Sequence, residues 1–110
     1  MPNATDVAPQ RWTNIKVLFD NGYYSAIYGD FRDKNDPPKR RLGVRWNGSP
    51  GTAGYPSLAG NPLWYCEPDF LEQPILTELL NRVLADPANP HSDDYEANIR
   101  AALAEIAGKP

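Results

Sequence analysis

The clearest hydrophobic pattern lies between residues 15 and 28, where apolar and polar positions alternate on both sides of Asn21-Gly22. This dipeptide is typical of a two-residue type I′ turn, in which both central residues have positive φ. Such a turn places Asp20 opposite Tyr23. Every second residue then shares a face of the hairpin, and we predict that the following six form its core face: Ile15, Val17, Phe19, Tyr24, Ala26 and Tyr28.

Two further strands are predicted after this hairpin. Residues 41–46 alternate, with Leu42, Val44 and Trp46 on the core side. A Gly- and Pro-rich stretch over 47–61 is long for a connection between neighbouring strands. Residues 62–67 follow as a short apolar run, which predicts a fourth and more deeply buried strand.

The chain then changes to helical spacing. Leucine, isoleucine and valine recur every three or four residues over 71–83, which predicts a helix over about 73–85. The DPANP segment at 86–90 ends it, and Ser92 is a suitable N-cap for a second helix over about 93–107. The fold class is therefore α+β: an antiparallel β-meander of about four strands, with a small half-open barrel as the alternative, followed by two C-terminal helices.

Composition supports one domain. The chain has 110 residues, and 41% of them are hydrophobic, which is enough for a single core and too few for two. Residues 1–11 lack periodicity and are predicted to be a flexible tail, with the domain spanning 12–110. Cys66 is the only cysteine, so no internal disulfide can form, and we expect a cytoplasmic protein without an export signal or a membrane span.

The second face of the hairpin carries Leu18, Tyr23 and Ile27, which are apolar enough to seek burial. A two-fold homodimer is the commonest way for a small chain to cover such a face. We therefore predict an oligomer interface at these three residues. The competing interpretation is a solvated face on a monomer.

A ligand site is predicted where the long loop follows the third strand. Clefts for small ligands combine aromatic walls with a few polar groups, and the loop brings such side chains together. The candidate ligand-binding residues are Arg45, Trp46, Asn47, Tyr55 and Trp64. The alternative is that the loop only covers the edge of the sheet.

Other chemistry has weaker support. Lys39, Arg40, Arg41 and Arg45 form a basic patch beside Trp46, which would suit weak nucleic-acid binding, but the net charge of −3 opposes it.

Three carboxylates, Glu67, Asp69 and Glu72, cluster at the junction before the first helix and could serve a small enzyme, although acids are common at helix starts. His91, the only histidine, has no partner at metal-ligand spacing. We assign no catalytic residue, metal or cofactor, and favour a protein that is not an enzyme.

Three segments also resemble a known family. LGVRWN (residues 42–47), GYP (54–56) and NPLWY (61–65) are similar to small uncharacterised proteins carried on bacterial integron gene cassettes. The resemblance implies a bacterial, mobile-element origin and a compact α+β fold that often self-associates, and it brings no known chemistry. The sequence thus predicts a homo-oligomeric binding or adaptor protein, whose ligand is a small molecule or a protein.

Overall fold

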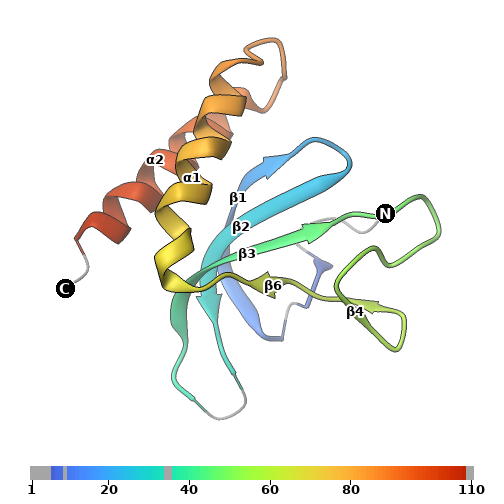
Figure 1. Cartoon of the computed structure of the whole chain (residues 1–110). Coiled ribbons are helices and arrows are strands. Elements are labelled where there is room, and N and C mark those ends of the chain that lie inside the picture. Colours follow the sequence, from blue (N-terminus) through green and yellow to red (C-terminus); the bar gives the residue numbers. More distant parts are fainter. Residues whose placement is uncertain (1–5, 9, 34–35, 109–110) are drawn as a thin grey trace. The chain divides into compact units, whose positions relative to one another are not determined.

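The architecture comes from a computed structural model that describes residues 6–8, 10–33 and 36–108. The described residues form six strands followed by two helices, and Figure 1 shows the strands preceding the helices along the chain. The strands are β1 (Trp12–Asp20), β2 (Tyr24–Phe31), β3 (Lys39–Trp46), β4 (Ser57–Leu58), β5 (Asn61–Pro62) and β6 (Tyr65–Cys66), and the helices are α1 (Asp69–Leu84) and α2 (Ser92–Ala107). The predicted α+β class is confirmed.

The chain divides into two compact units. Residues 1–67 form a sheet unit, and residues 68–110 form a unit of two helices. In the sheet unit β1, β2, β3 and β6 make one antiparallel sheet in that order, and β4 pairs with β5 in a separate hairpin. The main sheet is open, with β1 and β6 at its edges, and is not closed into a barrel.

Pairing between β2 and β3 is regular and agrees with the predicted core side. Tyr28 lies opposite Leu42 and Ala26 lies opposite Val44, so all four share one face. None of these side chains is more than 5% exposed. Alternation identified these positions because β-branched and large apolar side chains pack well on a pleated, half-buried surface.

The β1–β2 register differs from the prediction. Asp20 pairs with Ser25 instead of Tyr23. The Asn21 side chain accepts hydrogen bonds from the backbone amides of Tyr23 and Tyr24, at 3.0 and 2.9 Å, which widens the connection. Hydrogen bonds from the following amides to an asparagine side chain compete with the two-residue type I′ turn. That turn needs positive φ at both central residues, and in this connection only Gly22 has one, of 90°.

Two irregularities in β1 shift the register further. Pairing is interrupted between Thr13 and Lys16 and again between Val17 and Phe19. Asn14, in the first interruption, has a φ of 51°. Bulges of this kind re-aim side chains, and Leu18, at the second, is fully buried instead of lying on the predicted mixed face.

That predicted second face is covered by the chain itself. Val7, Trp12, Ile27 and Trp64 form a buried cluster on the side of the sheet that also carries Gly43. A Cβ at Gly43 would lie only 3.0 Å from the Trp12 ring, so the glycine leaves room for the indole. Ile15, Val17, Phe31 and Cys66 pack around this cluster.

The predicted tail contributes to this cluster. Val7 is 1% exposed, and its carbonyl accepts a hydrogen bond of 3.2 Å from Nε1 of Trp64. Residues 1–5 and 9 of the predicted tail lie outside the described residues.

The helical unit is an α1–α2 hairpin. α1 begins four residues earlier than predicted because Pro68 and Asp69 already open it, with acidic Asp69 and Glu72 in its first turn. Pro74 lies inside α1, one turn after its start, where it removes one backbone hydrogen bond of the helix. The side chains most deeply buried in this unit are Glu72, Leu76, Leu79, Val83, Ile99 and Ala102. Among the described residues, neither helix combines the length and the apolar character needed to cross a bilayer.

Candidate functional site

Arg45 is the most deeply buried charged side chain of the sheet unit, at 2% exposure. Its Nη1 donates hydrogen bonds to the carbonyls of Leu63, at 2.7 Å, and of Pro56, at 3.5 Å, and its Nη2 donates to the carbonyl of Ala53. Its Cζ lies 6.0 Å from the centre of the Trp64 ring. Burial lowers the pKa of the guanidinium. Arg45 therefore fastens the loop that follows its own strand at three points, an arrangement that we call the arginine clamp.

Asn47 fixes the end of β3 against the β1–β2 turn. Its Nδ2 donates to Oδ1 of Asp20 at 3.1 Å, and its Oδ1 accepts from the Ser25 hydroxyl at 2.7 Å. Its backbone amide donates to the carbonyl of Tyr23 at 2.7 Å. Asn47 is 3% exposed, so its side-chain amide makes its hydrogen bonds inside the protein.

Two glycines let the loop return against β3. Gly48 and Gly54 have φ values of 78° and 72°, which L side chains rarely adopt. A Cβ at Gly54 would lie 2.6 Å from Nη2 of Arg45, and one at Gly48 would lie 2.7 Å from the Cα of Gly54. The close approach thus needs glycine at both positions.

The returning loop places Tyr55 directly beside Trp46. The two residues form a β-bridge in which the Trp46 amide donates to the Tyr55 carbonyl at 2.7 Å and the Tyr55 amide donates to the Trp46 carbonyl at 2.9 Å. Directly opposed residues of an antiparallel pair share a face. The Tyr55–Pro56 peptide bond is cis.

Four aromatic residues consequently lie on one face at one end of the sheet. Tyr24 is the β2 partner of Trp46, Tyr55 is its partner on the other side, and Tyr65 lies opposite Val44, two residues before Trp46. We call this set, Tyr24, Trp46, Tyr55 and Tyr65, the aromatic row. Trp46, Tyr55 and Tyr65 are 57%, 68% and 52% exposed.

The rings of Tyr24 and Trp46 stand nearly perpendicular. Their centroids are 4.9 Å apart and their planes make an angle of 68°. Edge-to-face pairs of this kind are favourable because the positive edge of one ring meets the negative face of the other. The contact therefore joins the side chains of β2 and β3 at this end of the sheet.

One acidic residue, Glu67, acts electrostatically on a member of the aromatic row. Burial raises the pKa of the Tyr24 hydroxyl, and the negative charge of Glu67 raises it further. Burial also raises the pKa of the Glu67 carboxyl itself. The Glu67 backbone amide donates to the carbonyl of Leu42 at 3.0 Å, which fixes the residue next to β3.

The predicted basic patch is not a single surface. Arg45 is taken up by the clamp, and Nη2 of Arg41 donates to the Glu67 carbonyl at 2.5 Å. Nη1 of Arg40 contacts Oδ1 of Asp30 at 3.2 Å. Lys39 pairs with Phe31 at the other end of β3, seven residues from Trp46 or about 23 Å along the strand.

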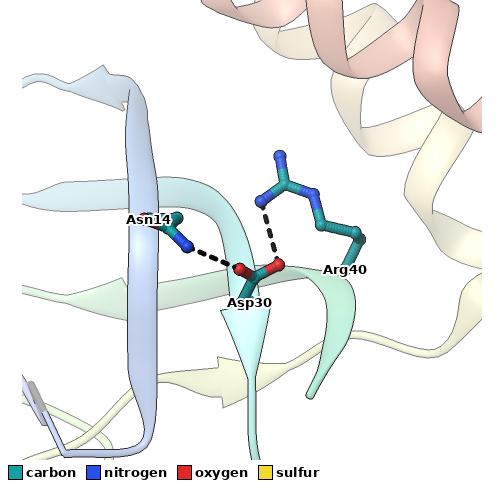
Figure 2. Close-up of polar contacts among 3 residues, drawn as sticks. All are labelled: Asn14, Asp30 and Arg40. Atoms are coloured by element: carbon teal, nitrogen blue, oxygen red, sulfur yellow. Dashed lines mark hydrogen bonds and ion pairs between the residues drawn. The ribbon is translucent and has the colours of Figure 1, made fainter. Parts of the chain in front are cut away.

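Asp30 forms a polar cluster with side chains from two other strands, as Figure 2 shows. Nδ2 of Asn14 donates to Oδ2 of Asp30 at 2.8 Å, on the opposite side from Arg40. The hydrogen bond from Asn14, followed by the contact with Arg40, lowers the pKa of Asp30. The cluster joins β1, β2 and β3 at the end of the sheet remote from the aromatic row.

The other predicted ligand and interface residues separate into buried and exposed ones. Trp64 is 6% exposed and belongs to the sheet core. Leu18 and Ile27 are fully buried, whereas Tyr23 is 75% exposed. Of the five predicted ligand residues, Trp46 and Tyr55 alone have more than half of their side chains at the surface; Arg45, Asn47 and Trp64 support them from within.

The junction carboxylates fall in different units. Glu67 ends the sheet unit, while Asp69 and the buried Glu72 belong to the first turn of α1. His91 is exposed, and its ring lies 5.8 Å from that of Tyr95. The described residues contain no group of three or more His, Cys, Asp or Glu side chains placed to hold a metal ion.

Sequence reasoning missed Tyr24 and Tyr65 as surface aromatics. Parity predicts Tyr24 on the core face, and its side chain does share the face of Ala26, but at the sheet end it is only half-buried. Tyr65 was expected inside a buried strand, yet β6 is a two-residue edge strand. The alignment of β6 with β3 places Tyr65 in the row, and the local sequence does not indicate this alignment.

Comparisons with known proteins found no match. No protein-family model, curated protein or solved structure is significantly similar to the chain.

Proposed function

We propose that the protein is a small binding protein whose contact surface is the aromatic row. The observation that carries the proposal is the pairing of Tyr55 with Trp46, which are both more than half exposed and whose backbones are joined by two hydrogen bonds. Aromatic residues that are already held in place lose little entropy when a ligand binds, and they dominate the energetics of many interfaces.

The surrounding structure supports this function because buried polar groups hold the loop that carries Tyr55 in position. The arginine clamp and the two glycines hold the loop so that Tyr55 lies beside Trp46. A loop that only covered the sheet edge would be expected to turn its aromatic side chains inward. Tyr55 instead lies on the surface.

A fragment screen by NMR tests the proposal. The protein is labelled with ¹⁵N and screened against neutral, anionic and cationic small molecules, with Trp46→Ala and Tyr55→Ala as comparison variants. Hits are expected to shift the amides of the row and to lose affinity in both variants. A screen without such hits, or with hits that both variants retain, would refute the row as a binding surface.

Self-association belongs to the same proposal. A second copy of the chain is the alternative occupant of the row, and Tyr23 is the exposed member of the predicted interface. We propose a homodimer, which light scattering over a concentration series tests. A strict monomer at high concentration would exclude the dimer and leave the small-ligand function intact.

We also propose that the chain belongs to the integron-cassette proteins and acts in the cytoplasm. The motifs LGVRWN, GYP and NPLWY, on which that resemblance rests, are the segments that build the clamp and much of the row. The single cysteine supports the cytoplasmic assignment. An integron recombination site flanking the gene would support the first proposal, and its absence would count against it.

A further inference from the structure

Two arginines lie together at the end of the sheet remote from the aromatic row, and they have no role in the proposed function. Arg11 and Arg32 line a hollow of about 250 Å³ with three further residues, Gln10, Thr13 and Pro38. We propose that this hollow binds the phosphate group of a small phosphorylated molecule.

The two arginines are directly opposed. The Arg32 amide donates to the Arg11 carbonyl at 2.8 Å, one step beyond the last pair of the β1–β2 ladder, Trp12 with Phe31. The rings of Trp12 and Phe31 contact each other, with centroids 4.9 Å apart, and alternation turns the two arginines to the opposite face of the sheet. Like charges in this relation repel each other. An anion in the hollow that both arginines line would turn this repulsion into attraction.

The carboxylates near the pair do not cancel its positive charge. Nη1 of Arg11 lies 3.8 Å from Oδ1 of Asp33, and both side chains are more than half exposed, so this ion pair contributes little. The Asp30 carboxylate, on the neighbouring pair of β1 and β2, is already engaged by side chains of β1 and β3. Within the described part of the chain the exposed Arg32 guanidinium makes no ion pair. Its donors are therefore available to a ligand.

The donors and the size of the hollow suit a phosphate group. A guanidinium presents paired N–H donors that match the oxygens of a phosphate. Gln10 and Thr13 add an amide and a hydroxyl, which also donate hydrogen bonds to oxygen. Pockets that enclose a whole drug-sized ligand have volumes of about 300–1,000 Å³. The smaller hollow thus fits one group of a ligand.

An adjoining hollow gives room for the rest of the molecule. It has a volume of about 400 Å³ and shares Gln10 and Arg11 with the first hollow. Three apolar and two polar residues complete its lining: Ala8, Pro62, Leu63, Asp6 and Asn61. Apolar walls with a few polar groups are typical of sites for small molecules.

The segment shared by the two hollows is flanked by strained backbone. Ala8 and Asn14 have φ values of 46° and 51°, and they lie on either side of residues 10–13. This conformation is unfavourable for alanine because of its Cβ. The Ala8 carbonyl accepts hydrogen bonds from the amides of Arg11 and Trp12, both at 3.1 Å, which hold the turn. Residues held in this way are concentrated at functional sites.

A titration with phenyl phosphate tests the proposal. The ¹⁵N-labelled full chain is titrated at constant low ionic strength with phenyl phosphate, inorganic phosphate and phenol, and the amides of Arg11, Thr13 and Arg32 are followed. We expect saturable binding of phenyl phosphate in the millimolar range, because the arginines are exposed to solvent. Inorganic phosphate is expected to bind about fivefold more weakly because it lacks the apolar ring, and phenol is expected not to bind.

Variants distinguish the site from a general effect of charge. Arg32→Gln is expected to weaken phenyl phosphate binding about tenfold or more. Arg100→Gln is the matched control, because Arg100 is an exposed arginine on α2 that is paired with Glu96, and its affinity is expected to equal that of the unmodified protein. Since Arg11 and Arg32 repel each other, Arg32→Gln should not lower the thermal unfolding midpoint in phosphate-free buffer. A purely structural role of Arg32 would lower it.

The outcomes are independent of the proposed function of the aromatic row. Absence of binding by both phosphates, or equal weakening by Arg32→Gln and Arg100→Gln, would overturn the site and leave the row unaffected. Equal affinity for phenyl phosphate and inorganic phosphate would overturn the phosphorylated molecule as the ligand in favour of the free anion. Loss of binding in Trp46→Ala would overturn the assignment to this end of the sheet, because Trp46 lies at the other end.

Discussion

Replacing Arg45 with methionine tests the arginine clamp most directly. Methionine keeps most of the aliphatic length and removes every donor, so the carbonyls of Ala53 and Leu63 lose their buried partner. Hydrogen bonds to charged groups contribute about 1.5–3 kcal/mol each. Two of them would give about 3–6 kcal/mol, and release of the desolvated guanidinium offsets part of this loss. We therefore expect the free energy of unfolding to fall by about 2–4 kcal/mol.

Urea unfolding followed by tryptophan fluorescence measures this loss. Trp12 and Trp64 are buried in the sheet unit, so their emission reports the unfolding of that unit. At ordinary m-values the expected change lowers the urea midpoint by about 1–2 M. Hydrogen exchange at the Trp46 and Tyr55 amides should accelerate as well, because the bridge between them is no longer held by the loop.

Arg40→Met is the matched control on the same strand. The ion pair of Arg40 with Asp30 is partly exposed, with side-chain exposures of 33% and 23%, and pairs of this kind contribute at most about 1 kcal/mol. If Arg45→Met and Arg40→Met destabilise the protein equally, the clamp does not hold the loop and the reasoning is wrong.

Three further predictions are informative. Gly54→Ala should lower the free energy of unfolding in urea by at least about 2 kcal/mol, because strain at positive φ adds to the clash with the clamp. Gly51→Ala is the control: Gly51 has a φ of 83° but open space around it, so the loss should be about 1 kcal/mol. Equal losses would show that the close approach is unimportant. The Asp30 carboxylate, whose pKa is lowered, stabilises the fold at pH values above its unfolded pKa, and this contribution is lost as the pH falls through its folded pKa. Asn14→Gly should therefore raise the Asp30 pKa in an NMR titration and reduce the loss of stability on acidification. An unchanged Asp30 pKa would exclude the Asn14 hydrogen bond as the cause of the lowered value. Leu76→Ala, at a fully buried position of α1, should cost about 2–5 kcal/mol by helical circular dichroism during thermal or urea unfolding, and a loss below about 1 kcal/mol would contradict its burial.

Alternation along the chain predicted the parts of the fold that depend on local pattern. The core side of β2 and β3 and the two helices follow from side-chain periodicity, which is readable from neighbouring residues. The β1 register was wrong because it depends on a competition between the Asn21 side chain and a two-residue turn, and on bulges near Asn14 and Leu18. Small differences in free energy decide such competitions, and composition does not reveal them.

The sequence pattern indicates which segments meet at the candidate site, but it does not indicate which of their side chains are buried. The loop and the third strand do meet at Trp46 and Tyr55. Arg45 and Asn47 looked like ligand-binding groups because charged and amide side chains are usually exposed. Their burial depends on which backbone carbonyls the loop presents, and that is a property of the folded loop rather than of the sequence pattern.

The hydrogen bond from Trp64 to Val7 has a consequence for how the sheet unit folds. It joins residues separated by 57 positions, so one side of the sheet is completed only after the chain has returned almost to its beginning. Closing so long a segment carries an entropic cost that must be met before the contact contributes, and contacts of this separation slow folding. During synthesis, the hairpin of β1 and β2 would emerge with Trp12 still uncovered. The interval before Trp64 arrives is then the period in which the nascent chain is most exposed to aggregation.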